Sequence, residues 1–177
     1  MKALLIIDMQ IGSFTPYESC YDTFGVIKCI NSLSNSFRAN KDKVIFIQHD
    51  GTTENCFVPN TQEWELLPEL VREGTDFIVS KTANDSFYKT ELEMLLTKHD
   101  ITELVVTGSA TDFCVDATVK SALTKDYEIT VIADAHTAAD RPFMNAATVV
   151  NYYNWLWDDF TATKFKINVV KTQDFLK

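Results

Sequence analysis

Short runs of apolar, often β-branched residues recur along the chain, and longer segments with helical spacing separate them. Each run has the length of a strand and is almost continuously apolar, which is typical of strands covered on both faces of a sheet. Strands that alternate with helices predict a parallel sheet between two helical layers, an α/β/α sandwich. The six expected strands lie at 2–8, 44–49, 77–80, 103–108, 129–133 and 166–171.

The segments between the strands carry apolar residues three or four positions apart, as amphipathic helices do. No repeat, low-complexity stretch or linker interrupts this alternation, so we expect one domain over residues 1–177. Helices are expected at 24–37, 92–96, 115–123 and 143–157, with a shorter one at 64–70.

Charge and composition limit the classes of molecule that the protein is expected to bind. Sixteen basic and 25 acidic side chains give a net charge of −9, which disfavours binding to nucleic acid or to an anionic membrane surface. No apolar run approaches the roughly 20 residues of a membrane-spanning helix. The start of the chain lacks the pattern of a signal peptide, and the four cysteines lack CxxC pairing. We therefore expect a cytoplasmic protein that acts on a small molecule.

Three chemically distinct side chains directly follow expected strands. In doubly wound sheets, ligands bind beyond the carboxyl ends of the strands, and Asp8, Lys81 and Cys114 fall there. Each has a structural alternative, because Asp8 could cap a loop, Lys81 could be solvated and Cys114 could be a buried apolar residue. Cys114 also opens an expected helix, whose dipole would lower the thiol pKa.

Together these residues predict acyl transfer by a cysteine nucleophile. The acid can take the thiol proton, while the ammonium stabilises the negative charges and holds the acid in place. The backbone N–H groups of Ala110 and Cys114 lie where a developing oxyanion would need donors. A dinucleotide-binding oxidoreductase is less favoured, because the loop at 8–13 lacks GxGxxG.

These segments resemble the isochorismatase-like cysteine hydrolases, which include nicotinamidases and related amidases. The resemblance covers about residues 2–160. It is carried by LLIIDMQ at 4–10 with Phe14, by Lys81 with DSF at 85–87 and TEL at 90–92, and by VVTGSATDFCV at 105–115. Further matches are QHDG at 48–51, DAHT at 134–137 and NW at 154–155.

The resemblance implies a Rossmann-like α/β/α sandwich whose six-stranded parallel sheet has the order 3-2-1-4-5-6. It assigns Cys114 as nucleophile, Asp8 as general base and Lys81 as their charge partner. It also implies a non-proline cis peptide between Ser109 and Ala110. Family members commonly form dimers or larger assemblies, so a homo-oligomer is expected.

Some members of the family, the nicotinamidases especially, bind a divalent metal through an Asp and several His. The histidines here are His49, His99 and His136, and no pair has ligand spacing. His49 and Asp50 could contribute to a metal site but cannot complete one, so we expect no metal and no cofactor. His49 either bonds to backbone at its strand end or contacts substrate, and His136 is expected in a structural loop.

Aromatic residues near the three strand ends are candidates for the wall of a substrate pocket. Phe14, Trp64, Tyr88 and Phe113 all lie in loops or at element starts, and packing in the core or between subunits is the alternative for each. Cys20, Cys29 and Cys56 have no acid–lysine context and are expected to be structural.

The sequence thus predicts a metal-independent cysteine hydrolase that cleaves a small amide through a thioester intermediate. Two alternatives stay open. One is vinyl-ether hydrolysis of the isochorismatase type, and the other is a redox or binding protein that uses a reactive thiol on the same fold.

Overall fold

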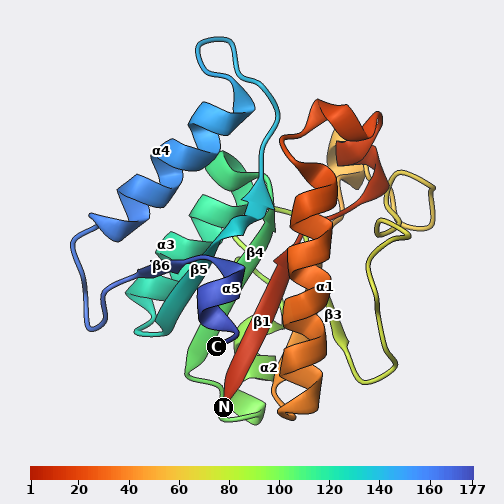
Figure 1. Cartoon of the computed structure of the whole chain (residues 1–177). Coiled ribbons are helices and arrows are strands. Elements are labelled where there is room, and N and C mark those ends of the chain that lie inside the picture. The colour runs from red at the N-terminus through yellow and green to blue at the C-terminus, as the bar shows by residue number, and fades with distance from the viewer.

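Six parallel strands form the centre of the molecule. The computed structural model describes all residues, 1–177. The sheet has the order β3-β2-β1-β4-β5-β6, which confirms the predicted fold (Figure 1). Its strands are β1 (Lys2–Ile7), β2 (Lys43–His49), β3 (Phe77–Lys81), β4 (Glu103–Ser109), β5 (Glu128–Thr137) and β6 (Asn168–Val170).

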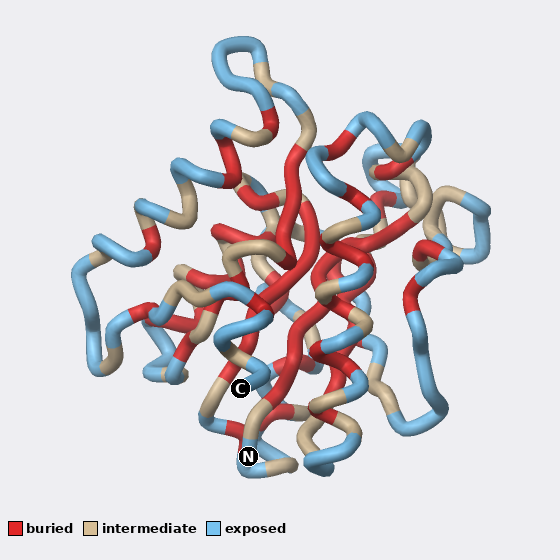
Figure 2. Tube along the Cα trace, viewed as in Figure 1, coloured by how far each residue is buried: buried red, intermediate tan, exposed pale blue.

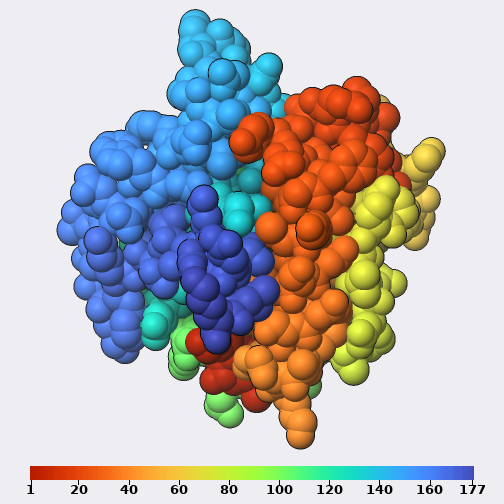
Figure 3. Space-filling model, viewed as in Figure 1, coloured from red at the N-terminus to blue at the C-terminus, as the bar shows by residue number.

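Helices cover both faces of this sheet. On one face lie α1 (Thr23–Ala39) and α5 (Thr172–Phe175), which sit side by side in the space-filling view (Figure 3). On the other lie α2 (Leu92–Lys98), α3 (Asp116–Thr124) and α4 (Ala146–Asp158). No helix combines the length and the apolar character needed to cross a membrane.

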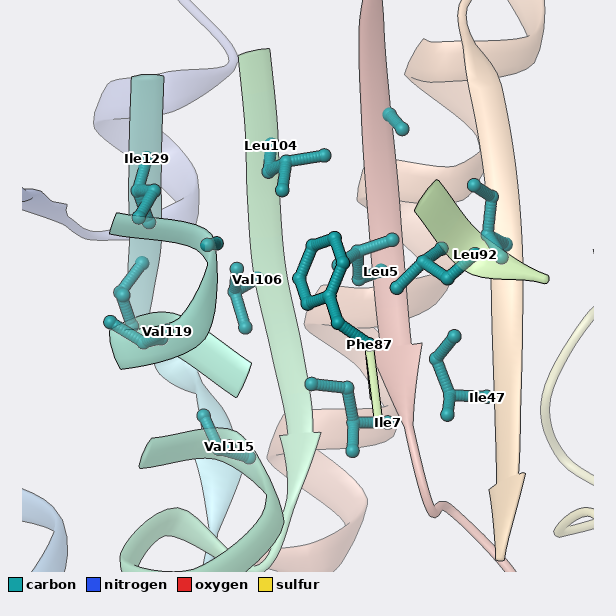
Figure 4. Packing of buried hydrophobic residues seen from close by; sticks show 14 of the residues in the cluster. Leu5, Ile7, Ile47, Phe87, Leu92, Leu104, Val106, Val115, Val119 and Ile129 are labelled. Atoms are coloured by element: carbon teal, nitrogen blue, oxygen red, sulfur yellow. The ribbon is translucent and has the colours of Figure 1, made fainter. Parts of the chain in front are cut away.

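The alternation of side chains along β1 divides the core between the two helical layers. Leu4 and Ile6 pack towards α1, whereas Leu5 and Ile7 pack towards α2 and α3 (Figure 4). All four side chains are completely buried, as are most positions along the central strands (Figure 2). Burial on both faces explains why these strands appear as continuous apolar runs in the sequence.

Two predicted helices differ from the structure. Residues 64–70 form turns, because their backbone bonds to the segment after β1: the Leu67 N–H donates to the Met9 carbonyl at 3.0 Å. The last long helix begins at Ala146, after Asn145, whose side chain accepts a hydrogen bond from the Thr148 N–H at 2.8 Å. The preceding Phe143 is 96% exposed and is not part of the helix.

The chain leaves β1 and β4 next to each other at the carboxyl edge of the sheet. Asp8 follows β1 in the left-handed conformation with φ 48°, which Asp tolerates better than most residues. Gly108 of β4 pairs with Ile7 and has φ 116°, and a Cβ there would collide with the Ile7 backbone. Only glycine allows this close approach, which places the loop after β4 beside Asp8.

Candidate active site

A buried lysine at the end of β3 joins the two side chains that follow β1 and β4. The ammonium of Lys81 lies 2.6 Å from Asp8 Oδ2 and 3.2 Å from Cys114 Sγ. Its third hydrogen bond goes to the Ala83 carbonyl at 3.0 Å. The Lys81 side chain has no exposed surface, so all three of its donors are used inside the protein.

Charge is balanced within this cluster. Burial lowers the pKa of Lys81, but the carboxylate of Asp8 and the sulfur of Cys114 outweigh burial, and the net pKa is raised. Lys81 is therefore an ammonium at neutral pH, paired with one carboxylate. The other oxygen of that carboxylate, Asp8 Oδ1, is buried and has no hydrogen-bond partner in the protein.

The surroundings of Cys114 favour the protonated thiol. Burial and the Asp8 carboxylate together raise the pKa of Cys114 to about 12, and Lys81 offsets this only in part. The expectation of a lowered pKa at a helix N-terminus is wrong for this site, since desolvation opposes charge on the sulfur. Cys114 lies two residues before α3, within a π-helical turn at Thr111–Val115. Its Sγ is 3.6 Å from Asn84 Oδ1.

The loop between β4 and this turn presents a free backbone donor. The Ser109–Ala110 peptide is cis in the structure. The Ala110 N–H donates to no backbone or side-chain acceptor of the chain. It lies on the wall of the same cavity as Cys114.

A buried histidine bonds to Thr111, which follows the Ser109–Ala110 peptide. His136 lies in the extension of β5 and not in a loop, which corrects the sequence-based expectation. Its Nδ1 is 2.9 Å from Thr111 Oγ1, and its Nε2 is 3.0 Å from Asn154 Oδ1. The Asn154 amide donates to the Ala133 carbonyl, so its oxygen accepts from Nε2 and leaves Nδ1 to accept from Thr111. Burial lowers the pKa of His136 to about 4, which keeps the ring neutral.

A cavity of about 220 Å³ opens beside the thiol. Its wall contains the predicted His49 and Phe113, together with residues that the sequence did not single out. The complete lining is Asp8, Gln10, Ser13, His49, Phe57, Asn84, Ser109, Ala110, Phe113 and Cys114.

Three predicted wall residues lie elsewhere. Phe14 is 1% exposed and packs in the core under α1, because the 3-10 turn η1 (Ile11–Phe14) directs it inward. Trp64 lines a separate hollow with Leu66 and Arg72, since the 64–70 segment is not a helix. Tyr88 is half exposed, with the Lys89 ammonium 5.1 Å from its ring centroid, and it does not reach the cavity.

Gln10 fixes the position of His49 by bridging the ends of β1 and β2. Its side-chain oxygen accepts from the His49 N–H at 2.7 Å, and its amide donates to the His49 carbonyl at 3.1 Å. Burial, followed by the charge of Lys81, lowers the pKa of His49, so the imidazole is neutral. Its Nδ1 is buried without a partner, and its ring meets Phe57 edge to face at 6.0 Å between centroids.

The residues near the cavity do not fit a metal ion. Asp50 is off the cavity wall, and its carboxylate accepts from the Thr52 N–H and hydroxyl at 3.0 and 2.5 Å. The other ligand-type side chains on the wall, Asp8 and Cys114, both contact the Lys81 ammonium. No group of three or more His, Cys, Asp or Glu side chains in the structure is arranged to hold a metal.

The fold and this site define a Rossmann-like α/β protein with a buried aspartate, lysine and cysteine at the switch point of its sheet. The model of the isochorismatase domain matches residues 2–153. The chain therefore belongs to the isochorismatase family.

Individual relatives agree with this assignment. Streptothricin hydrolase from Streptomyces noursei is 33% identical over 142 residues, which cover 80% of this chain and 56% of that protein. Ureidoacrylate amidohydrolase from Serratia proteamaculans is 31% identical over 99 residues, 54% of this chain and 40% of the relative. A solved isochorismatase family protein has a TM-score of 0.87 at 27% identity, covering 96% of this chain and 98% of its own. The chain spans about half the length of the streptothricin hydrolases it matches.

Proposed function

We propose that this protein is a metal-independent cysteine hydrolase that cleaves the C–N bond of a small amide through a thioester. The observation that carries the proposal is the contact of one buried ammonium with both Asp8 and Cys114, at a cavity wall that also holds the free Ala110 N–H. Nucleophile, base, charge partner and oxyanion donor are the four parts that acyl transfer needs.

The first half of the reaction forms the thioester. Asp8 takes the Cys114 proton as the sulfur attacks the amide carbonyl, and the carbonyl oxygen becomes an oxyanion held by the N–H groups of Ala110 and Cys114. The protonated Asp8 then gives that proton to the amide nitrogen as the C–N bond breaks. Ammonia or an amine leaves, and the acyl group stays on the sulfur.

The second half releases the acid. Asp8, again a carboxylate, takes a proton from water as the water oxygen attacks the thioester carbonyl. The C–S bond breaks, the sulfur regains the proton from Asp8, and the carboxylic acid leaves. Lys81 stays an ammonium throughout and stabilises whichever of Asp8 and Cys114 is negative.

The relatives support amide cleavage in general, since one of them is named as an amidohydrolase. The raised pKa of Cys114 lowers the fraction of thiolate, the form that oxidants attack, which favours acyl transfer assisted by Asp8 over the redox alternative.

The test is turnover of a panel of small amides, followed as ammonia release with and without a chelator. Cys114→Ala is expected to lose activity by at least about 1,000-fold while keeping the wild-type circular dichroism spectrum. The control Cys29→Ala, at a half-buried cysteine outside the cavity, is expected to keep full activity. A quenched reaction should show Cys114 carrying the acyl mass. Full activity in Cys114→Ala, or loss with chelator, would contradict the proposal.

A further inference from the structure

The cavity beside Cys114 offers no lysine to a substrate anion. Its lining contains neither Lys nor Arg. The nearest ammonium, Lys81, has no exposed surface and gives its three hydrogen bonds to Asp8, Ala83 and Cys114. An ammonium has three donors, so none is left for a ligand. Its charge is already balanced by the Asp8 carboxylate.

The nearest guanidinium is also engaged. Arg141 lies with its guanidinium carbon 5.0 Å from the ring centroid of Phe113, a residue of the cavity wall. Its Nε and Nη2 form a two-pronged ion pair with Asp112, at 2.6 and 2.8 Å. This ion pair balances the charge of the guanidinium, and Nη1 contacts the Asp140 carbonyl at 3.5 Å.

The remaining polar groups of the cavity suit an uncharged ligand. Ser13, Asn84 and His49 provide a hydroxyl, an amide and an imidazole, none of which carries charge at neutral pH. The free Ala110 N–H is required by the carbonyl under attack. The volume of about 220 Å³ lies below the roughly 300–1,000 Å³ of pockets that hold drug-sized ligands.

We infer that the substrate is a small amide without a carboxylate, and that the site rejects amides that carry one. This inference rests on the proposed function and narrows its substrate class. A substrate carboxylate would lie in the same small cavity as the Asp8 carboxylate, with Lys81 already shared between Asp8 and Cys114. Like charges placed together without a cation to separate them are strongly unfavourable.

Diamides and their half-acids provide the test, because the two molecules of each pair differ only in replacing a terminal NH₂ by O⁻. Ammonia release from succinamide, glutaramide and adipamide is compared with release from the corresponding monoamide monoacids. We expect kcat/KM to be at least about 100-fold higher for each diamide that fits, after correction for its two amides. Equal or higher values for the half-acids would overturn the inference.

A cation introduced into the wall should change this preference. Ser13→Lys adds an ammonium at the cavity, and we expect it to raise the kcat/KM of the half-acid relative to the diamide by about tenfold or more. Ser32→Lys, on the exposed surface of α1, adds the same charge away from the site and should leave the ratio unchanged. An unchanged ratio in Ser13→Lys would count against the inference.

Calorimetry with Cys114→Ala separates this inference from the proposed chemistry. If the wild-type protein hydrolyses none of the six compounds, the proposed function fails for this substrate range, and binding alone decides the charge preference. Tighter binding of a diamide than of its half-acid would still support the inference. Equal binding, tighter binding of the half-acid, or no binding of any diamide would overturn it.

Discussion

Replacing Lys81 by Met tests how much of the site depends on one buried charge. The substitution keeps an unbranched side chain, one atom shorter, and removes the ammonium that lies 2.6 Å from Asp8. The Asp8 carboxylate is then left in a protein interior without its counter-ion. Breaking a buried pair in this way costs about 3–5 kcal/mol, a large part of the 5–15 kcal/mol that typically stabilises a domain.

A second lysine provides the matched control. Lys120 lies at the same 2.6 Å from Asp116, but its side chain is 44% exposed and the pair is an i,i+4 contact on α3. Such pairs contribute about 0.3–0.5 kcal/mol, so Lys120→Met should reduce the free energy of unfolding by less than about 1 kcal/mol. Burial, and not distance, is expected to separate the two variants.

The assay is urea unfolding followed by circular dichroism, with ammonia release measured on the folded variants. Lys81→Met should lower kcat by about 100- to 1,000-fold, the usual loss when one electrostatic stabiliser is removed. Because the folded pKa of Lys81 is raised, its contribution to stability is complete below about pH 10.4 and is lost as pH rises through the folded value. The stability difference from wild type should therefore be constant between pH 7 and about 10. Equal losses in Lys81→Met and Lys120→Met would refute the reasoning.

Two further substitutions test the support of the site. Because His136 is neutral in the folded state, only the unfolded state gains a proton as pH falls from about 6.5 to 4. At 1.36 kcal/mol per pH unit, this lowers the free energy of unfolding by about 3 kcal/mol. His136→Gln should flatten that part of the curve of unfolding free energy against pH, as measured by urea unfolding. An equally steep curve in the variant would assign the loss to other groups. Gly108→Ala should destabilise the protein by at least about 2 kcal/mol, because the added methyl group meets the Ile7 backbone. The control Gly74→Ala should leave thermal stability nearly unchanged, because no atom lies within 4 Å of its added Cβ. Similar melting temperatures for the two glycine variants would contradict this account.

The central strands were predictable because both of their faces are covered. Residues 3–7 of β1 are completely buried, and their apolar character is therefore continuous in the sequence. The edge strand β3 gives a weaker signal, since Ile78 is 41% exposed. The order of the strands follows from the family resemblance and not from the apolar pattern, which carries no information on neighbours.

The helix predictions were wrong where non-local bonds or caps decide the structure. Residues 64–70 have helical spacing, but their backbone pairs with residues more than fifty positions earlier, and Pro68 lacks an N–H. The start of the last helix was predicted from the apolar pattern at 143–157. Asn145, a favoured N-cap residue, indicates the observed start at Ala146.

Some residues of the candidate site could be predicted from the sequence and others could not. Asp8, Lys81 and Cys114 could be singled out because each follows a strand, and parallel strands bring their carboxyl ends to one edge. Phe57 and Asn84 could not, because they reach the cavity from irregular segments whose course no periodicity describes. The prediction that Phe14 and Trp64 line the cavity was wrong, because nearness to a strand end does not fix the direction of a side chain.

The balance of charge links the resting state of the thiol to the choice of substrate. One ammonium and one carboxylate leave the site neutral, and a thiolate would add a negative charge that burial opposes, so the thiol keeps its proton. In the proposed mechanism, proton transfer to Asp8 becomes favourable as the sulfur bonds to the carbonyl carbon and the Ala110 N–H donates a hydrogen bond to the resulting oxyanion. A substrate carboxylate would likewise add a negative charge that burial opposes. The Ala110 N–H could not stabilise that charge, because the carbonyl under attack requires this donor. Under the proposed function, the neutrality that favours the protonated thiol would thus also favour an uncharged amide over a carboxylate-bearing one.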